Sequence, residues 1–229
     1  MNKVSLFLLF SCLSIVIFSC KKDDVDPQQP AVESYMNLSA GSSRVYSFQE
    51  NNPPTAPSSY TLTPAGRDTT VDGKVFTIFN GRNGSLEYYN VTGNNYYTLI
   101  KLPGGFTNDV FVNLYLKSDQ PVNSSWTQNY TVDIPGLPLP ATVVLTNKIV
   151  EKDITRTVSS LTYNNVIHVS SSISGNVGPL PITGLSSDIN NYYAPKYGMI
   201  ESSNIFGINF SGIQDSTNTV TKLTSSVIP

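Results

Sequence analysis

The chain is dominated by short segments in which apolar and polar residues alternate, and this pattern constrains its fold more than any other feature. No segment has the apolar period of about 3.6 residues that marks an amphipathic helix. Since side chains of a strand point alternately to opposite faces, the pattern is typical of half-buried β-strands. The strand-like segments are residues 44–49, 74–80, 85–91, 95–101, 109–117, 125–133, 141–150, 165–173, 197–203, 206–212 and 219–228.

Turn-forming dipeptides separate several of these segments, among them Asp72-Gly73, Asn83-Gly84 and Gly93-Asn94. About a dozen short strands are too many for a flat open sheet, so we expect the sheet to curl. The sequence therefore predicts a mainly β protein with one strongly curved antiparallel sheet, an open half-barrel. A β-sandwich is the alternative.

Composition argues against nucleic-acid binding. Charged residues make up 13% of the chain, about half the usual share of roughly 25%. The formal net charge is −2, and no basic patch appears. Nucleic-acid binding needs a positive surface, which this sequence does not provide.

Residues 1–19 are predicted to be a secretory signal peptide. Lys3 is followed by an uncharged apolar run from Val4 to Phe18. This run is shorter than the roughly 20 residues that a membrane-spanning helix needs, and it suits the apolar core of a signal peptide. The segment ends in Ile-Phe-Ser-Cys, with the cysteine at position 20.

The Ile-Phe-Ser-Cys stretch resembles the lipobox of bacterial lipoproteins. The resemblance implies that Cys20 receives a diacylglyceryl group and becomes the new N-terminus, so that a membrane is the first partner. Several acyl chains together anchor a protein stably. An ordinary signal peptide with a chance cysteine is the alternative. Because Cys12 would leave with the signal peptide, the mature chain would keep no free thiol.

The segment after Cys20 is polar and contains proline, so residues 20–36 are predicted to be a lipidated flexible tether. Residues 37–229 are predicted to be a single β domain. Lys-Lys-Asp-Asp at 21–24 resembles the start of lipoproteins from the Bacteroidetes. That resemblance implies an outer-membrane protein that faces the cell surface, with a periplasm-facing protein as the alternative.

Residues suited to catalysis or metal binding are scarce, and we predict no catalytic residue, metal site or cofactor. His168 is the sole histidine, whereas zinc usually takes three or four ligands. No nucleophile elbow, phosphate-binding loop or calcium loop occurs. A hydrolase would need two carboxylates about 5–10 Å apart and is the least favoured alternative. The available carboxylates are Asp68, Asp72, Glu87, Asp109, Glu151, Asp153, Asp188 and Glu201.

The chain has 13 tyrosines and a single tryptophan, Trp126. A flat exposed row of these rings could stack on sugars, which would suit a glycan-binding accessory lipoprotein at the cell surface. The favoured interpretation is that the tyrosines pack within strands and leave their hydroxyl groups wet.

Two apolar proline-rich tracts, residues 134–145 and 177–185, are predicted to be loops or sheet edges, because proline cannot donate to a strand ladder. They would either cap an open barrel end, which we favour, or line a ligand cavity. Elsewhere, Asp-Thr-Thr at 68–70 and Asp-Ser-Thr at 215–217 resemble O-glycosylation sites of exported Bacteroidetes proteins. That resemblance makes Thr69 and Ser216 candidate modification sites.

The segment Asn-Asn-Tyr-Tyr-Ala-Pro-Lys-Tyr-Gly-Met-Ile-Glu at 190–201 is predicted to be a sheet corner. Tyr192 and Tyr193 would end a strand on opposite faces, and Pro195 would interrupt the ladder because it lacks an N–H group. Gly198 is expected to have a positive φ or to pack against a neighbouring backbone or ring, and the sheet would restart at Met199.

This corner resembles the Tyr-Tyr-Ala-Pro-x-x-Gly-x-Ile signature of an uncharacterised family of secreted bacterial lipoproteins. Val-Tyr-Ser-Phe at 45–48, the Trp126 segment and residues 161–173 match other family features. Position 196 departs from the family, with lysine in place of glycine. The resemblance implies an open half-barrel similar to the lipoprotein carrier and the outer-membrane lipoprotein receptor.

In those relatives the concave side of the sheet holds acyl chains. By resemblance, we expect a non-catalytic binding or structural module with an apolar concavity for a lipid-like or small ligand. Fold alone does not establish that function. The oligomeric state stays open.

Overall fold

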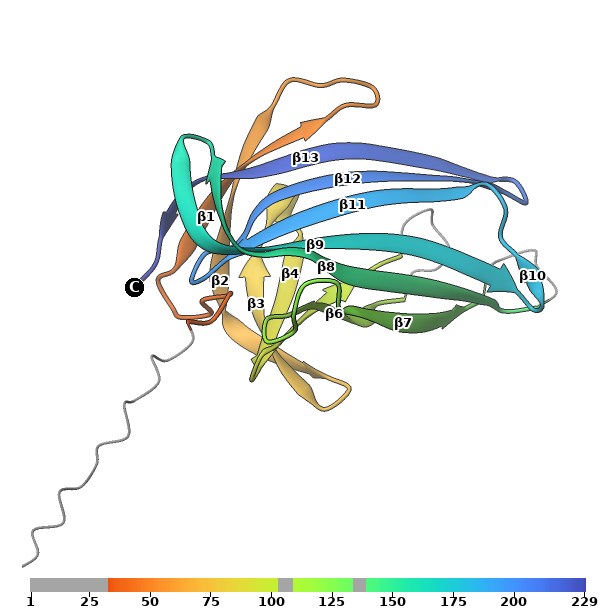
Figure 1. Cartoon of the computed structure of the whole chain (residues 1–229), viewed down its shortest axis with the longest axis horizontal. Helices are drawn as coiled ribbons and strands as arrows, with labels where there is room; N and C mark the ends of the chain where they lie inside the picture. Colours follow the sequence, from red (N-terminus) through yellow and green to blue (C-terminus); the bar gives the residue numbers. More distant parts are fainter. Residues whose placement is uncertain (1–32, 103–108, 134–138) are drawn as a thin grey trace, which may run out of the picture. The chain divides into compact units, whose positions relative to one another are not determined.

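A computed structural model describes residues 33–102, 109–133 and 139–229, and Glu33–Pro229 belong to one compact unit (Figure 1). In these ranges, no helix is long and apolar enough to cross a membrane. Apart from the 3-10 turn η1 (Arg82–Gly84), the described elements are strands. They are β1 (Ser43–Glu50), β2 (Ser58–Val71), β3 (Lys74–Asn80), β4 (Leu86–Thr92), β5 (Asn95–Ile100), β6 (Phe111–Lys117), β7 (Ser125–Val132), β8 (Ala141–Val158), β9 (Leu161–Val177), β10 (Leu180–Pro181), β11 (Leu185–Ala194), β12 (Gly198–Phe210) and β13 (Ile213–Val227).

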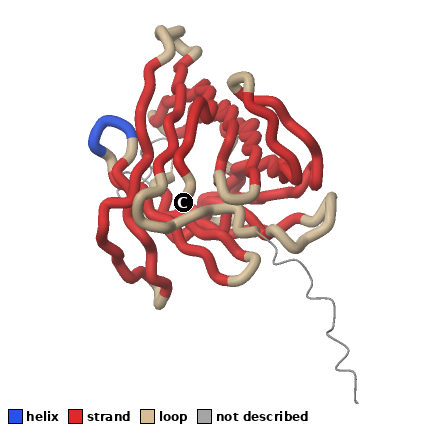
Figure 2. The backbone as a smooth tube through the Cα atoms, turned by 90° about the vertical axis from the view of Figure 1, so that its left-hand side faces the viewer, coloured by secondary structure: helices blue, strands red, loops and turns tan. Residues whose placement is uncertain are grey.

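The strands form one antiparallel sheet in the order β6-β5-β4-β3-β2-β1-β13-β12-β11-β9-β8-β7, with β10 paired to β9 alone. The sheet curls until it is nearly closed into a barrel-like shape, as Figure 2 shows. Register shifts within β8 and between Pro64 and Asp68 of β2 add to the bending, because bulges increase local twist. The predicted strongly curved antiparallel sheet is confirmed, and the β-sandwich does not form.

Strand β13 occupies the middle of the sheet, although it comes after β1–β12 along the chain. One of its edges pairs with β1, from Ser43↔Val227 to Glu50↔Thr219. Its other edge pairs with β12, from Glu201↔Lys222 to Phe210↔Ile213. Strands β1–β6 and strands β7–β12 are therefore joined by backbone hydrogen bonds only through β13.

Most predicted strands are confirmed within a few residues, but β2 was not predicted, and only the end of β11, at Tyr192 and Tyr193, was predicted. Strand β2 contains Pro64 and Gly66, and β11 carries polar residues on both faces, so neither shows simple alternation. The predicted strands 197–203 and 206–212 are a single strand, β12. The predicted strands 141–150 and 165–173 are parts of the longer β8 and β9.

Buried apolar side chains inside the barrel form two clusters. The Tyr35 cluster includes Tyr35, Met36, Tyr46, Leu116, Ile149, Ile167, Val169, Tyr193, Ile200 and Leu223. The Phe206 cluster includes Leu102, Tyr130, Val132, Val143, Leu145, Ile182, Phe206 and Ile208. Together they fill the two ends of the space that the curled sheet encloses.

The segment before β1 belongs to the β domain. Tyr35 and Met36 are buried in the Tyr35 cluster. The backbone N–H of Tyr35 donates to the Tyr96 hydroxyl at 2.9 Å, and the Tyr35 hydroxyl donates to the Asn165 carbonyl at 2.7 Å. The predicted domain boundary at residue 37 is therefore too late, because the compact unit begins at Glu33. The signal peptide (1–19), Cys20 and the tether up to residue 32 lie outside the described residues.

The second proline-rich tract forms a turn and an edge strand beside β9. Residues 178–184 are mainly turn structure, and Pro181 lies in the edge strand β10, as predicted. Ile182 is buried in the Phe206 cluster, and none of residues 178–184 lines the cavity described below. In the first tract, residues 134–138 lie outside the described part of the chain and 141–145 are part of β8.

Candidate functional site

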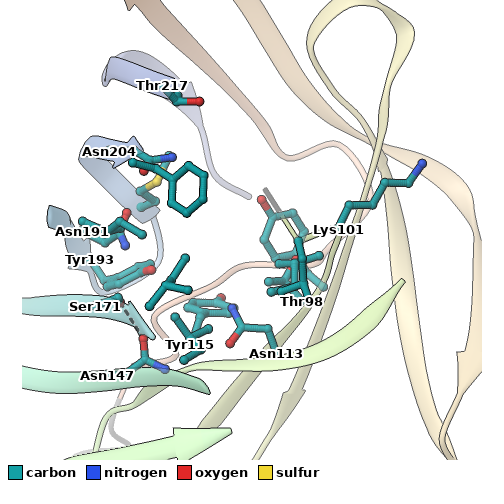
Figure 3. A pocket seen from close by; sticks show the side chains of 18 of the residues that line it. Thr98, Lys101, Asn113, Tyr115, Asn147, Ser171, Asn191, Tyr193, Asn204 and Thr217 are labelled. Atoms are coloured by element: carbon teal, nitrogen blue, oxygen red, sulfur yellow. Dashed lines mark hydrogen bonds between the residues drawn. The ribbon is translucent and has the colours of Figure 1, made fainter. Parts of the chain in front are cut away.

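A cavity of about 350 Å³ lies inside the barrel between the Tyr35 and Phe206 clusters. Figure 3 shows its side chains entering from β5 and β6 on one side and from β8, β9, β11 and β12 on the other. Most of the lining side chains are aliphatic or aromatic. These are Met36, Tyr46, Leu62, Tyr89, Ile100, Leu102, Tyr115, Val143, Leu145, Ile173, Ile189, Tyr193, Met199 and Phe206.

Uncharged polar side chains form a belt around the middle of the cavity. Cross-strand pairing places Asn147 beside Ser171, Ser171 beside Ile189, and Ile189 beside Asn204. Across the cavity, Thr98 and Asn113 are paired neighbours on β5 and β6. We call these five residues the polar belt: Thr98, Asn113, Asn147, Ser171 and Asn204.

Apolar residues flank the polar belt on both sides. On one side of the belt, two residues further along each strand, lie Ile149 of β8 and Val169 of β9. Both belong to the Tyr35 cluster. In the other direction are Leu145 on β8 and Phe206 on β12, which belong to the Phe206 cluster. The cavity is thus mainly apolar on both sides of the belt, where Asn191, paired with Val169, and Thr217, paired with Phe206, are the other uncharged polar lining residues.

Only part of the polar belt is hydrogen-bonded to the protein. The Ser171 hydroxyl donates to Asn147 Oδ1 at 2.6 Å, and Asn147 Nδ2 donates to the Leu114 carbonyl at 3.4 Å. By contrast, Oδ1 of Asn113 and Oδ1 of Asn204 are buried without a hydrogen-bond partner in the described residues. Asn113 is only 9% exposed, so its unpaired amide carries a desolvation cost.

The interior of the cavity carries no charge. None of its lining residues is an aspartate or glutamate. Its one lysine, Lys101, is exposed, and its side chain extends away from the labelled amides in Figure 3. Burial raises the pKa of Tyr115 and of Tyr193, so both hydroxyls stay protonated at neutral pH. The described lining residues can therefore offer neutral hydrogen bonds and apolar surface to a ligand.

Side chains, rather than a backbone ladder, close the barrel between β6 and β7. The Gln128 amide accepts from the Leu114 N–H at 2.9 Å and donates to the Val112 carbonyl at 3.1 Å. Trp126 Nε1–H donates to the Leu114 carbonyl at 2.7 Å, and the Tyr130 hydroxyl donates to the Val112 carbonyl at 3.3 Å. We call this contact the β6–β7 seam.

The predicted sheet corner at 190–201 is present. Tyr193 is buried and lines the cavity, whereas Tyr192 points to the outer face. Strand β11 ends at Ala194, before Pro195, and β12 begins at Gly198. Gly198 has φ +80°, and a Cβ added there would lie 2.9 Å from Met36 Sδ. The positive φ is the first of the two alternatives expected for Gly198.

A fully buried arginine ties this corner to the start of the domain. Arg44 Nε donates to the Tyr197 carbonyl. Its Nη2 donates to the carbonyls of Asn37 at 2.9 Å and Lys196 at 3.3 Å. These acceptors come from the corner and from the segment before β1, so the corner has a structural role.

His168 lies on the outer face of β9 and is 8% exposed. Its Nδ1 is 3.1 Å from Glu151 Oε2, and its Nε2 is 2.9 Å from Asn190 Oδ1. Its ring stacks on Tyr192 with 4.2 Å between ring centroids. Both ring nitrogens therefore have partners within the protein.

The arrangements that the two alternative functions require are absent from the described residues. None of the 13 tyrosines is exposed, and Trp126 is only 8% exposed, so the exposed aromatic row that the glycan-binding alternative requires is not present in the described residues. No carboxylate lines the cavity. Burial raises the pKa of Glu87, whose Oε2 accepts a hydrogen bond from the Tyr89 hydroxyl, but Glu87 lies outside the cavity lining. No group of three or more potential metal ligands occurs in the ranges described.

Neither candidate O-glycosylation residue lines the cavity, although Ser216 directly precedes Thr217, which does. Thr69 is half-buried on β2, and Ser216 is exposed on β13, where its Oγ accepts from Asn52 Nδ2 at 3.3 Å. Sequence reasoning did not identify the polar belt. The signal that could have found it is asparagine at positions where the alternation calls for an inward apolar residue, such as Asn113 within Phe-Val-Asn-Leu-Tyr.

Comparison with known proteins identifies no family for this chain. No family model matches it, and no curated protein matches it either. A crystal structure of a presumed lipoprotein from Parabacteroides distasonis ATCC 8503 is similar, with 8% sequence identity and a TM-score of 0.48. The similarity covers 85% of this chain and 99% of that one. The motif-based family resemblance therefore stays a prediction.

Proposed function

We propose that this protein is a lipid-anchored protein of the bacterial cell envelope whose β domain is a non-catalytic binding module for a small, mainly apolar molecule. The observation that carries the binding proposal is the cavity of about 350 Å³ inside the barrel. Ligand sites in proteins range from about 300 to 1,000 Å³ and combine apolar walls with a few polar groups. The lining of this cavity has that composition.

The anchoring proposal rests on the sequence around Cys20. An apolar segment without charge precedes this cysteine, and a polar, proline-containing segment follows it. We place the protein in the outer membrane, facing the cell surface, on the resemblance of its start to Bacteroidetes lipoproteins. In this proposal, residues 21–32 connect the lipid to the β domain, which begins at Glu33.

Filling the cavity tests the binding proposal. Ile173 lines the cavity, whereas its neighbour Ser172 is exposed on the other face of β9. Ile173→Trp should abolish binding of the uncharged fluorescent probe N-phenyl-1-naphthylamine, because the indole takes up cavity space. Ser172→Trp is the matched control and should bind the probe like the wild type. Probe binding that persists in Ile173→Trp would place the ligand elsewhere.

Cell fractionation tests the anchor. Cys20→Ala removes the only thiol that could carry lipid in the mature chain, so the variant should leave the membrane fraction. Ser19→Ala keeps a small residue before Cys20 and should stay in the membrane fraction. If Cys20→Ala remains membrane-bound, lipid attachment at this residue is wrong, while the binding proposal stands unaffected.

A further inference from the structure

We infer that the ligand is an uncharged molecule with a hydroxyl or amide group in the middle of an apolar body. This inference rests on the proposed binding function and narrows it to a ligand class. It comes from three properties of the cavity: the absence of interior charge, the unpaired amides of the polar belt, and the apolar residues on both sides of that belt.

Because the lining of the cavity carries no interior charge, ionised ligands do not fit it. A carboxylate or ammonium buried here would lose its hydration and meet no opposite charge, because no acidic residue lines the cavity and Lys101 extends away from the belt. An uncompensated buried charge is far more costly than a buried neutral polar group. Fatty-acid anions therefore fit this cavity poorly, although their chains match its walls.

The unpaired amides then define the polar group of the ligand. Asn113 is nine-tenths buried, and Oδ1 of Asn113 and Oδ1 of Asn204 have no hydrogen-bond partner among the described residues. A half-turn about the Cβ–Cγ bond exchanges Oδ1 and Nδ2, so each amide can present a donor or an acceptor. A hydroxyl or amide group both donates and accepts, and it would supply the missing hydrogen bonds.

The position of the polar belt in the cavity indicates where along the ligand its hydroxyl or amide group lies. On β8, Asn147 lies between Ile149 of the Tyr35 cluster and Leu145 of the Phe206 cluster. On β12, Asn204 lies between Ile200 of the Tyr35 cluster and Phe206 of the Phe206 cluster. A molecule with a terminal polar head would leave an apolar region of the cavity unfilled or press its head against apolar walls. A polar group in the middle of the ligand would let both apolar halves of the ligand contact apolar walls of the cavity.

Three nine-carbon compounds test the charge of the ligand and the position of its polar group separately: nonan-5-ol, nonan-1-ol and nonanoate. Each is used to displace N-phenyl-1-naphthylamine from the full chain at about pH 8, where a carboxylate is ionised. We expect nonan-5-ol to bind about tenfold more tightly than nonanoate and several-fold more tightly than nonan-1-ol. If nonanoate competes as well as nonan-5-ol, the inference is overturned.

Substitutions in the belt test the named residues. Asn113→Leu should weaken nonan-5-ol binding by about tenfold, because the lost amide can no longer bond the hydroxyl. Asn129→Leu changes an exposed asparagine on β7 and should leave the affinity unchanged. Asn204→Leu is a second belt variant, used if Asn113→Leu does not give a wild-type near-ultraviolet circular dichroism spectrum.

The outcomes distinguish the inference from the proposed function. A wild-type chain that binds no probe, or an Ile173→Trp variant that still binds it, defeats the binding proposal. A chain that binds the probe but shows equal affinities for nonan-5-ol in wild type and in the belt variants defeats only the inference. In that case the Asn113 and Asn204 amides are hydrated by water rather than bonded to the ligand.

Discussion

Gly198 shows how one residue fixes the position of two parts of the chain. Its φ of +80° is unfavourable for residues with a side chain, and its α-carbon faces Met36 Sδ. Met36 belongs to the segment before β1, and the corner around Gly198 also supplies the carbonyl of Tyr197 to Arg44. The glycine therefore allows the start of the domain to pack directly against the β11–β12 corner.

Gly198→Ala should lower the free energy of unfolding by about 2–3 kcal/mol, from backbone strain together with the contact at Met36. Gly212→Ala is the matched control, since Gly212 has φ +82° but no neighbour within 4 Å of an added Cβ. The control should lose only about 1 kcal/mol. Urea unfolding measures both values, and equal losses would contradict the packing role of Gly198.

At the scale of elements, the β6–β7 seam is the part of the barrel that depends on side chains. Gln128 mimics a peptide group, because its amide accepts from one backbone N–H and donates to one backbone carbonyl of β6. Trp126 adds a third hydrogen bond. Elsewhere around the barrel, neighbouring strands are joined by regular antiparallel pairing.

Gln128→Leu should destabilise the protein by about 1–3 kcal/mol, because the N–H of Leu114 loses its partner and the carbonyl of Val112 keeps only the Tyr130 hydroxyl. Amide exchange at Leu114 should become faster. Gln214→Leu, at an exposed position on β13, serves as the control and should change stability by less than about 0.5 kcal/mol. Unchanged exchange at Leu114 in Gln128→Leu would show that Gln128 does not hold the seam.

At the scale of the whole molecule, β13 joins two groups of strands that otherwise meet only through side chains. Removing residues 213–229 should therefore abolish the cooperative unfolding transition, because β1 and β12 would both lose a paired neighbour. A chain that ends at Val227 keeps all of β13 and should unfold cooperatively. Thermal unfolding followed by circular dichroism checks both chains, and a cooperative transition without β13 would contradict this connection.

The sequence predicted much of the sheet, because strands such as β1, β3 and β8 show inward apolar and outward polar residues. It predicted only the end of β11, at Tyr192 and Tyr193, because the inward residues of this strand include Asn191 as well as Ile189 and its two faces look alike. Inward-facing asparagines are also the reason that the cavity site was not predicted from the sequence. Asn113 and Asn204 resemble surface residues in the sequence, and only the closure of the barrel shows that they lie around one cavity.

The corner at Gly198 was predictable because its requirement is local: proline ends one strand, and glycine adopts a positive φ before the next. The role of Arg44 was not predictable in this way. Its acceptors, the carbonyls of Asn37, Lys196 and Tyr197, come from segments about 150 residues apart, and carbonyl acceptors leave no signal in residue type.

The central place of β13 also determines when the sheet can be completed during folding. In a chain that is exported N-terminus first, β1 emerges long before residues 213–227, its partner. The long-range pairing that completes the sheet must wait until the last strand arrives. The unfinished chain exposes two unpaired strand edges during that interval, and such edges are prone to aggregation.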